Sequence, residues 1–594
     1  MLKNCVMQLR KLIVLYVLLG FALQFFGAYG VHTFQRLLDS VPSSSGLGQI
    51  GSLLLFYGAL LAICAVLNYA SEYPQTALPR SLSEKLKLAS LSRISRMDYL
   101  AYRNLGTGEL IQTIDNGAQA GSGIVYGFYL RIFHELLPAM LFSMLFIGLY
   151  SPTILFVVAG GYVVVFVLTR LLLRYLYAVK ESMLANQEKL SRYSVRGFME
   201  LVVFRLNRRY EREIERLTGT VDEIVNQNVR IRMIHESFFA LFELLVILIK
   251  LAVLALGIRD VAEGRSTIGV TLALLLLIDK VYSPIAIFNV IYVDYKLDKL
   301  TYDRFERYLS APSDPNLEQG REVTKLRGEI AFEGVNFGYG ENKKQANGAG
   351  SPHEETPSSL LRDVSLVIPA GSSVAIVGLS GSGKSTLVKL MLGLLKKDSG
   401  RLLIDGVDID ELCLDSLYAR LSYISQDAPV FDDTLRGNLT FGEHADEDAL
   451  MRVLDDALIG DKVRSLPEGL DTQVGERGMK LSGGEKQRLA FARVLAQSRD
   501  MVVLDEPVSA LDNITERRIM ETVLDRFRGR TLIVVAHRLH AIRRVDRILL
   551  MRGGELVDQG SFDELLERSD YFRELWSKDG AESGAESGAD GRAS

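Results

Sequence analysis

The chain has 594 residues, of which 48% are hydrophobic and 24% are charged, and its formal net charge is −4 at pH 7. This near-neutral balance does not indicate a nucleic-acid partner, and Cys5, Cys64 and Cys413 lack the spacing of a metal or redox motif. The hydrophobic fraction is instead high enough to predict that part of the chain is solvated by lipid.

The apolar residues gather in six segments before residue 295. Each is expected to span a membrane as a helix, because about 20 apolar residues cross a bilayer. The segments are residues 12–31, 51–70, 126–149, 153–173, 238–258 and 268–292. Lys3, Arg10 and Lys11 precede the first one, but its apolar run is too long for a secretory signal. With a cytoplasmic N-terminus the inner loops hold most of the basic residues, so the positive-inside rule predicts this orientation.

Two charged residues interrupt the last two segments. Lys250 and Asp279 lie about 12 and 11 residues from the segment ends, roughly 18 and 16 Å at 1.5 Å per residue. Both therefore fall near the middle of a hydrocarbon core of about 30 Å. Because an unpaired charge there costs about 2.5 to 3.5 kcal/mol, we expect that they pair with each other or face a polar or charged substrate. The third alternative is that the helix ends lie elsewhere than predicted.

Several segments lie outside the apolar runs. The inner loops 71–125 and 174–237 keep helical periodicity, which predicts that the membrane helices continue into the cytoplasm. Residues 341–358 and 577–594 lack an apolar face and are predicted to be an inserted surface loop and a disordered tail. The expected order is a transmembrane domain at 1–310, a linker at 311–325, a second domain at 326–576 and the tail.

The sequence GLSGSGKST at 378–386 has the spacing of a phosphate-binding loop. It follows the apolar run 373–377 and leads into a helical pattern, which is the order of strand, loop and helix that such a loop requires. Its glycines would let backbone N–H groups face the phosphates. Lys384 would reach the β and γ phosphates, and Ser385 would bind Mg²⁺. The predicted nucleotide contacts are Gly378, Ser380, Gly381, Ser382, Gly383, Lys384, Ser385 and Thr386.

A second apolar run, 500–504, ends in two carboxylates, Asp505 and Glu506. Asp505 can hold the water shell of a metal ion, while Glu506 can polarise the attacking water. About 20 residues upstream, Leu481 begins the sequence LSGGE. At this point the chain resembles the ATP-binding cassette (ABC) ATPases, because LSGGE is the signature of that family.

The resemblance implies roles for further residues. Tyr339 is similar to the residue that stacks on adenine, Gln426 to the glutamine that senses Mg²⁺ and touches the membrane domain, and His537 to the switch histidine on the γ-phosphate. Residues 472–478 resemble a loop found in exporters. ATP and Mg²⁺ are the expected cofactors, with Mg²⁺ held through Ser385, Gln426 and Asp505. Family cassettes work head to tail, so Ser482 and Gly484 are expected to cap the ATP on the loop of a partner subunit. The other residues of the cassette that are expected to bind the nucleotide are Gly483, Glu485 and Asp512.

The membrane half also resembles exporter half-transporters. Residues 104–110, followed by Asp115, look like the first cytoplasmic loop, where a short coupling helix docks on the cassette. Residues 197–200 occupy the place of the second coupling helix but lack the glycine that commonly follows it. One membrane domain and one cassette make half of a transporter, so we expect a homodimer or a heterodimer with a second half-transporter.

The expected fold is a polytopic all-α transmembrane domain of six helices with long cytoplasmic extensions, followed by an α/β P-loop ATPase domain of ABC type. The resemblance implies ATP-driven export across the cytoplasmic membrane by alternating access, with the N-terminus and the ATPase domain in the cytoplasm. Candidate substrates are a peptide, a drug-like amphiphile or another small hydrophobic compound. The expected partners are membrane lipid and the exported substrate, and no nucleic acid. The alternatives are a floppase of lipids or lipid-linked precursors, and a non-transporting regulatory ATPase, which the complete set of hydrolytic residues disfavours.

Overall fold

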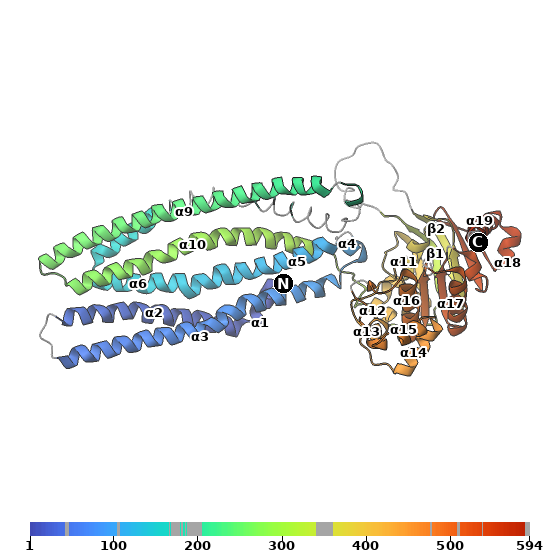
Figure 1. Ribbon diagram of the computed structural model, residues 1–594, viewed down its shortest axis with the longest axis horizontal. Helices are drawn as coiled ribbons and strands as arrows, with labels where there is room; N and C mark the ends of the chain where they lie inside the picture. The colour runs from blue at the N-terminus through green and yellow to red at the C-terminus, as the bar shows by residue number, and fades with distance from the viewer. Residues whose placement is uncertain are drawn as a thin grey trace. The chain divides into compact units, whose positions relative to one another are not determined.

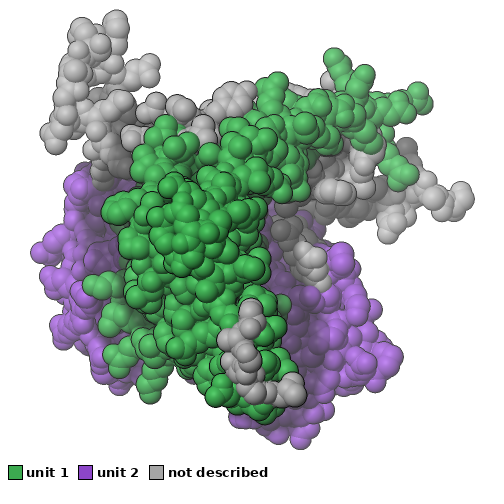
Figure 2. All heavy atoms as spheres, turned by 90° about the vertical axis from the view of Figure 1, so that its left-hand side faces the viewer, with its two compact units in different colours: residues 1–97, 101–312 green, residues 98–100, 313–594 purple. Residues whose placement is uncertain are grey.

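The structure is a computed structural model of the chain. It describes residues 1–588 except 42–46, 104–106, 340–359, 476–477, 508–510, 537 and most positions between 166 and 209. The chain divides into two compact units, which Figure 2 colours separately. The first contains Met1–Met97 and Ala101–Pro312, and the second contains Asp98–Leu100 and Ser313–Ser594.

The first unit consists of long helices that run side by side (Figure 1). Three of them have 48, 53 and 42 residues, so at 1.5 Å per residue they are roughly 70, 80 and 60 Å long. This is about twice the 30 Å hydrocarbon core of a bilayer and confirms that membrane helices continue beyond it. The helices outside the masked positions are α1 (Leu2–Gln8), α2 (Arg10–Ser40), α3 (Leu47–Ile94), α4 (Tyr99–Arg103), α5 (Thr107–Ser122), α6 (Leu137–Tyr150), α9 (Tyr210–Ala262) and α10 (Ile268–Leu309).

Among the described residues, four helices are long and apolar enough to cross a membrane, namely Arg10–Ser40, Gly48–Ile94, Leu110–Tyr150 and Leu217–Ala262. The fourth predicted segment is present as a shorter apolar helix at Pro152–Val165, and the rest of that segment lies largely outside the described residues. The sixth segment lies in α10, whose apolar stretch is interrupted by Asp279 and Lys280.

The third predicted segment contains a feature that its sequence pattern does not indicate. Between α5 and α6 the backbone is π-helical at Gly123–Leu130 and Ile132–Leu136. In the second stretch, Nδ1 of His134 is hydrogen-bonded to the carbonyl oxygen of Tyr16 at 2.7 Å, and its ring stacks on the Tyr16 ring. A Cβ added at Gly20 would lie 2.4 Å from the same nitrogen, so this glycine makes room for the histidine.

The second unit is an α/β domain with two sheets. The antiparallel sheet has the order β2-β1-β4-β5, and the larger sheet has the order β10-β9-β3-β8-β7-β6 with parallel pairing except at β10. The antiparallel strands are β1 (Ile330–Phe337), β2 (Leu361–Ile368), β4 (Ser399–Ile404) and β5 (Val407–Asp408). The others are β3 (Ser373–Val377), β6 (Leu421–Ile424), β7 (Met501–Asp505), β8 (Thr531–Val535), β9 (Arg547–Arg552) and β10 (Glu555–Gly560). The strands β3, β7 and β8 are nearly continuous in buried apolar residues, as expected for a parallel sheet covered on both faces.

Helices complete the second unit and bury the two faces of the sheet in separate apolar clusters. The α-helices are α11 (Lys384–Met391), α12 (Leu414–Tyr418), α13 (Leu435–Thr440), α14 (Glu447–Asp456), α15 (Gly460–Ser465), α16 (Gly483–Gln497), α17 (Asn513–Arg526), α18 (Phe562–Arg568) and α19 (Asp570–Gly588). The last helix continues to Gly588, into the segment that we expected to be disordered. Its first turns are held by Phe572, which is fully buried, and by Trp576, which packs on Phe562.

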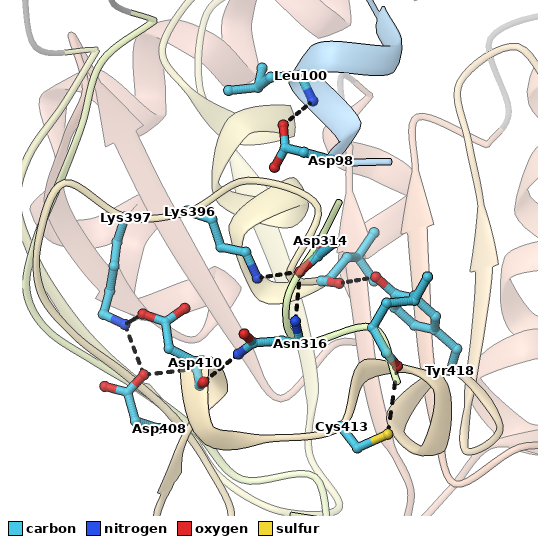
Figure 3. Close-up of polar contacts among 12 residues, drawn as sticks. Asp98, Leu100, Asp314, Asn316, Lys396, Lys397, Asp408, Asp410, Cys413 and Tyr418 are labelled. Atoms are coloured by element: carbon cyan, nitrogen blue, oxygen red, sulfur yellow. Dashed lines mark hydrogen bonds and ion pairs between the residues drawn. The ribbon is translucent and has the colours of Figure 1, made fainter. Parts of the chain in front are cut away.

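The predicted linker 311–325 is for the most part bound to the second unit (Figure 3). Asp314 forms an ion pair with Lys396 at 3.2 Å, and the side-chain amide of Asn316 donates to the carbonyl oxygen of Asp410. Backbone hydrogen bonds join Arg321 to Glu411 and Cys413, and Leu317 packs against the apolar cluster. We call residues 313–326 the strap, because they tie the start of this unit to its core.

The first predicted coupling segment, 104–110, lies partly outside the described residues, and Thr107–Leu110 belong to the first turns of the long helix α5. A separate short helix, α4, precedes it. Asp98–Leu100 count with the second unit, where Tyr99 and Leu100 pack against its apolar cluster. The second predicted coupling segment, 197–200, lies outside the described residues.

Candidate functional site

The phosphate-binding loop connects the buried strand β3 to α11 with two residues in the left-handed region. Gly381 has a φ of +80° and Gly383 a φ of +100°, which disfavours a side chain at either position. A Cβ at Gly383 would also lie 2.6 Å from Cδ2 of Leu361. The loop therefore curls tightly before α11 begins and directs backbone N–H groups to one side, as an anion-binding loop does.

Lys384 is folded back onto this loop. Its side chain is 4% exposed, and its Nζ donates to the carbonyl oxygens of Gly378 at 2.9 Å and Leu379 at 3.1 Å. Burial lowers the pKa of Lys384, while the carboxylates of Glu506 and Asp505 act in the opposite direction. The ammonium group is thus held in the loop and next to two negative charges.

The two carboxylates after β7 make separate contacts. Asp505 is 3% exposed and accepts a hydrogen bond of 3.1 Å from Oγ of Ser385, and burial raises the pKa of this carboxyl group. Glu506 accepts a hydrogen bond of 2.6 Å from Nε2 of Gln426, at the end of β6. Its backbone has a φ of +50°, which is unusual for a residue with a side chain and is typical of functional sites.

These groups surround one cavity of about 270 Å³. This is slightly below the range of about 300 to 1,000 Å³ for pockets that hold whole drug-sized ligands, so it fits the phosphate end of a nucleotide. The lining residues are Leu360, Ser380, Gly381, Gly383, Lys384, Ser385, Thr386, Gln426 and Glu506. The structure therefore brings together six of the predicted nucleotide contacts and the two predicted groups from other loops, Gln426 and Glu506.

Tyr339 lies beside this cavity and is 44% exposed. Its hydroxyl oxygen is 3.4 Å from Oγ1 of Thr386, a lining residue, and its ring meets the Phe337 ring edge-on at 5.0 Å. An aromatic ring that lies beside a phosphate site has the position that stacking on adenine requires.

The signature residues lie elsewhere in the same unit. Ser482 caps α16, with its Oγ accepting from the N–H of Glu485, while the Glu485 carboxylate accepts from the N–H of Ser482. Asp512 caps α17 in a similar way through the N–H groups of Ile514 and Thr515. None of Ser482, Gly483, Gly484, Glu485 and Asp512 is in the lining of the phosphate cavity. Within one chain, the observed role of Ser482 and Asp512 is to start two helices.

The predicted switch residue His537 lies outside the described residues, but the segment after it is described. Arg538 donates to the Leu511 carbonyl and to Asn513, and it forms an ion pair of 2.8 Å with Glu516. The next residue, Leu539, donates its backbone N–H to Asp579 of α19 at 2.8 Å. Sequence reasoning missed these contacts, although the basic residue directly after His537 was a signal for an acidic partner.

The two charged residues predicted near the middle of the membrane are paired. Nζ of Lys250 in α9 and Oδ1 of Asp279 in α10 make an ion pair. This agrees with the expectation that the two residues neutralise each other. Sequence analysis did not consider Lys280, the residue after Asp279.

The fold and the site together define a class of protein, a membrane protein built of long helices that carries a P-loop nucleotide-binding domain. Comparisons with known proteins place it within that class. Residues 13–284 match the ABC transporter transmembrane region, and residues 361–509 match the ABC transporter domain that contains the phosphate loop and LSGGE. The chain belongs to the ABC transporter family and has the half-transporter arrangement of one membrane region fused to one nucleotide-binding domain.

Relatives differ in the functions that their names state. The chain is 35% identical over 328 residues to "Iron-sulfur clusters transporter ATM1, mitochondrial" of Candida glabrata, covering 54% of this chain and 43% of the relative. It is 38% identical over 267 residues to the "ATP-dependent lipid A-core flippase" of Burkholderia orbicola, covering 45% and 42%. The flippase of Cupriavidus pinatubonensis is 33% identical over 364 residues, covering 60% and 58%. The matched part is therefore less than two thirds of the length of each of these relatives.

A solved structure of a bacterial Atm1-family ABC exporter with ATP bound superposes with a TM-score of 0.80 at 24% identity. The match covers 96% of this chain and 98% of that one. It establishes that both units share the fold of that protein.

Proposed function

We propose that this chain is one half of an ATP-driven exporter that works by alternating access. The observation that carries the proposal is the 270 Å³ cavity in which Lys384, Gln426 and Glu506 converge, in a chain that also has a membrane region. The phosphates of ATP would lie on the loop, with Lys384 exchanging its carbonyl contacts for phosphate oxygens. Glu506, held by Gln426, would accept a proton from the attacking water.

The residues at the cavity also fit Mg²⁺. Ser385, Asp505 and Gln426 offer a hydroxyl, a carboxylate and an amide oxygen, and Mg²⁺ binds such oxygens together with substrate phosphates. The amide nitrogen of Gln426 is used by Glu506, which leaves its oxygen for this role. When bound there, Mg²⁺ would neutralise charge on the β and γ phosphates.

The working unit would be a dimer in which Ser482 of one subunit contacts the ATP on the phosphate loop of the other. Within one chain the contacts of Ser482 are those of a helix cap. The Ser482→Ala variant therefore tests the proposal when it is compared with the same substitution at another helix cap, Ser561. Ser561 starts α18 with the same capping box, formed with Glu564.

Each cap substitution should cost about 0.5 to 2 kcal/mol of stability. If Ser482 serves a partner's ATP, only Ser482→Ala should also lower ATP turnover, by about tenfold or more, since a charge-assisted contact to phosphate is lost. Equal turnover in the Ser482→Ala and Ser561→Ala variants would show that Ser482 acts only as a cap.

The substrate would be an amphiphilic or small hydrophobic compound, or a peptide, moved across the cytoplasmic membrane with the cassette on the cytoplasmic side. A lipid floppase is the second candidate, and the names of the flippase relatives support it. Stimulation of ATP hydrolysis by a panel of drugs, peptides and lipids, with the full chain in nanodiscs, distinguishes these substrates. Absence of ATP hydrolysis by the folded dimer under all these conditions would overturn the proposal.

A further inference from the structure

Besides Lys250 of α9, the membrane-spanning helices carry Lys280 in α10, and its side chain turns toward α2. A Cβ added at Gly27 of α2 would lie 2.9 Å from Nζ of Lys280, so the ammonium group occupies the space that a side chain at Gly27 would fill. The adjacent residue Asp279 points about 100° away around the helix and reaches α9. The two neighbouring charges thus face different parts of the unit.

The depth of this ammonium group follows from a contact near the outer end of α2. There Asp39 accepts hydrogen bonds from the N–H of Gly269 at 3.1 Å and from Oγ1 of Thr267 at 2.8 Å. Gly27 lies 12 residues before Asp39, and Lys280 lies 11 residues after Gly269, which correspond to roughly 18 and 16 Å of helix. The depths agree, so the ammonium group stays deep in the membrane-spanning part and does not extend toward its surface.

The charge of Lys280 is not balanced within the part of the chain that the structure describes. The carboxylate of Asp279 is paired with Lys250, and Lys280 itself forms no ion pair or hydrogen bond with a described residue. An uncompensated charge at this depth is costly, and such residues usually face a binding site or a water-filled path. Among the described residues, Lys250 therefore has a charge partner and Lys280 has none.

A second glycine of α2 leaves room on the same face of that helix. Gly30 lies three residues after Gly27 on the same face of α2, and a Cβ added there would meet no atom within 4 Å. Gly30 is nevertheless buried among the helices. An ammonium group beside such room suits a negatively charged group, while the surrounding apolar helices suit a hydrocarbon tail.

We infer that Lys280 binds the acidic group of the transported compound, and that the substrate class is an anionic amphiphile carrying a phosphate or carboxylate. This inference rests on the proposed export function and narrows it. The acidic group could come from a membrane lipid headgroup or from a compound that enters from the cytoplasm. Both present the same chemistry to Lys280, so the test includes one arm for each source.

The experiment uses the full chain in phosphatidylcholine nanodiscs and follows ATP hydrolysis relative to each variant's own unstimulated rate. Dodecyl phosphate and laurate are compared with dodecyl maltoside, which has a tail of the same length and no charge. For the lipid source, phosphatidylglycerol replaces part of the phosphatidylcholine. The variants are Lys280→Met, Lys280→Arg and Gly27→Ala, and Lys299→Met serves as control because it removes an exposed lysine from the same helix.

ATP hydrolysis by the wild type and by Lys280→Arg should be stimulated by the acidic compounds of at least one source and not by dodecyl maltoside. Lys280→Met should raise the half-maximal concentration at least about tenfold, as expected for loss of a charge-assisted contact. Gly27→Ala should weaken stimulation as well, because the methyl group of the alanine competes with the ammonium group for space. The substitution should not weaken the helix itself, because alanine favours a helix more than glycine does. Lys299→Met should behave as wild type.

Two results would overturn the inference while leaving the proposed export function in place. One is wild-type stimulation by acidic compounds that Lys280→Met retains in full. The other is a wild type that hydrolyses ATP and responds to neutral compounds, or to none of those used, without a preference for acidic ones. A wild type that hydrolyses no ATP would instead contradict the proposed function itself.

Discussion

Replacing Arg538 by alanine should destabilise the second unit strongly, because it leaves a buried carboxylate without its partner. The Glu516 side chain is 0% exposed, its Oε2 is 2.8 Å from Arg538, and its Oε1 has no hydrogen-bond partner among the residues that the structure describes. Breaking a buried ion pair from one side costs about 3 to 5 kcal/mol. At about 2 to 4 °C per kcal/mol for a domain of this size, the melting temperature should fall by roughly 6 to 20 °C.

The assay can be made specific for this unit. Trp576 is the single tryptophan of the chain, and it packs on Phe562 with ring centroids 5.1 Å apart, so its fluorescence follows unfolding of the second unit in the full-length protein. Arg544→Ala is the matched control. Arg544 pairs with Asp525 at the surface, where both side chains are more than half exposed, and its loss should cost less than about 1 kcal/mol.

The effect of Arg538→Ala should also depend on pH. Burial raises the pKa of Glu516 and Arg538 lowers it, so removing the arginine takes away the main opposition to the upward shift and leaves only the weaker effect of His540. A carboxyl group whose pKa is raised in the folded state makes its full contribution to folding stability below its unfolded pKa, about 4.3. That contribution is lost as the pH rises through the folded pKa. The deficit in melting temperature should therefore grow from pH 5 to pH 8.

Adding Glu516→Gln should recover much of the loss, because the stranded charge is then gone. A double variant as unstable as Arg538→Ala alone, or a deficit that does not change with pH, would refute the reasoning.

Three further predictions concern other contacts of the chain. Glu506→Gln should lower ATP turnover by about 10² or more and retain ATP binding, because Gln426 can still donate to the new amide oxygen; turnover near that of the wild type would exclude a role as general base. Asp579→Ala should lower the steady-state turnover of ATP with little change in KM for ATP. The reason is that the N–H of Leu539, two residues after His537, loses its acceptor. Asp579→Asn keeps an acceptor oxygen and should retain most of the activity. Lys250→Ala should lower the thermal stability of the helical unit, followed by circular dichroism, and adding Asp279→Ala should restore much of it; a further loss in the double variant would show that the ion pair does not balance the charges.

The phosphate site could be predicted because its main residues are close together in the sequence and have a characteristic spacing. Nine consecutive residues carry the loop, and the strand before it and the helix after it follow from simple hydrophobic patterns. The hydrogen bond between Ser385 and Asp505 joins residues that are 120 positions apart. It could be anticipated because both residues follow the carboxyl ends of strands that share one parallel sheet.

Features that depend on partners from other elements could not be predicted in the same way. Asp279 and Lys280 are adjacent in sequence, and only the packing of the helices decides that Asp279 meets Lys250 of α9 while Lys280 turns toward Gly27 of α2. The extent of α19 was also missed. The sequence after Lys578 has no apolar face, but it follows a helix that is already anchored by Phe572, and alanine and glutamate extend such a helix at little cost.

Because of the strap, the folded cassette begins before its first strand. Leu317 and Val323 pack on its apolar cluster, and Arg321 is hydrogen-bonded through its backbone on both sides, although all three precede the first strand. A fragment cut at residue 326 would expose that apolar surface and leave the backbone groups of Glu411 and Cys413 without partners. A chimera that joins this cassette to another membrane unit should therefore cross over at Ala311 or Pro312, so that the cassette carries its own strap.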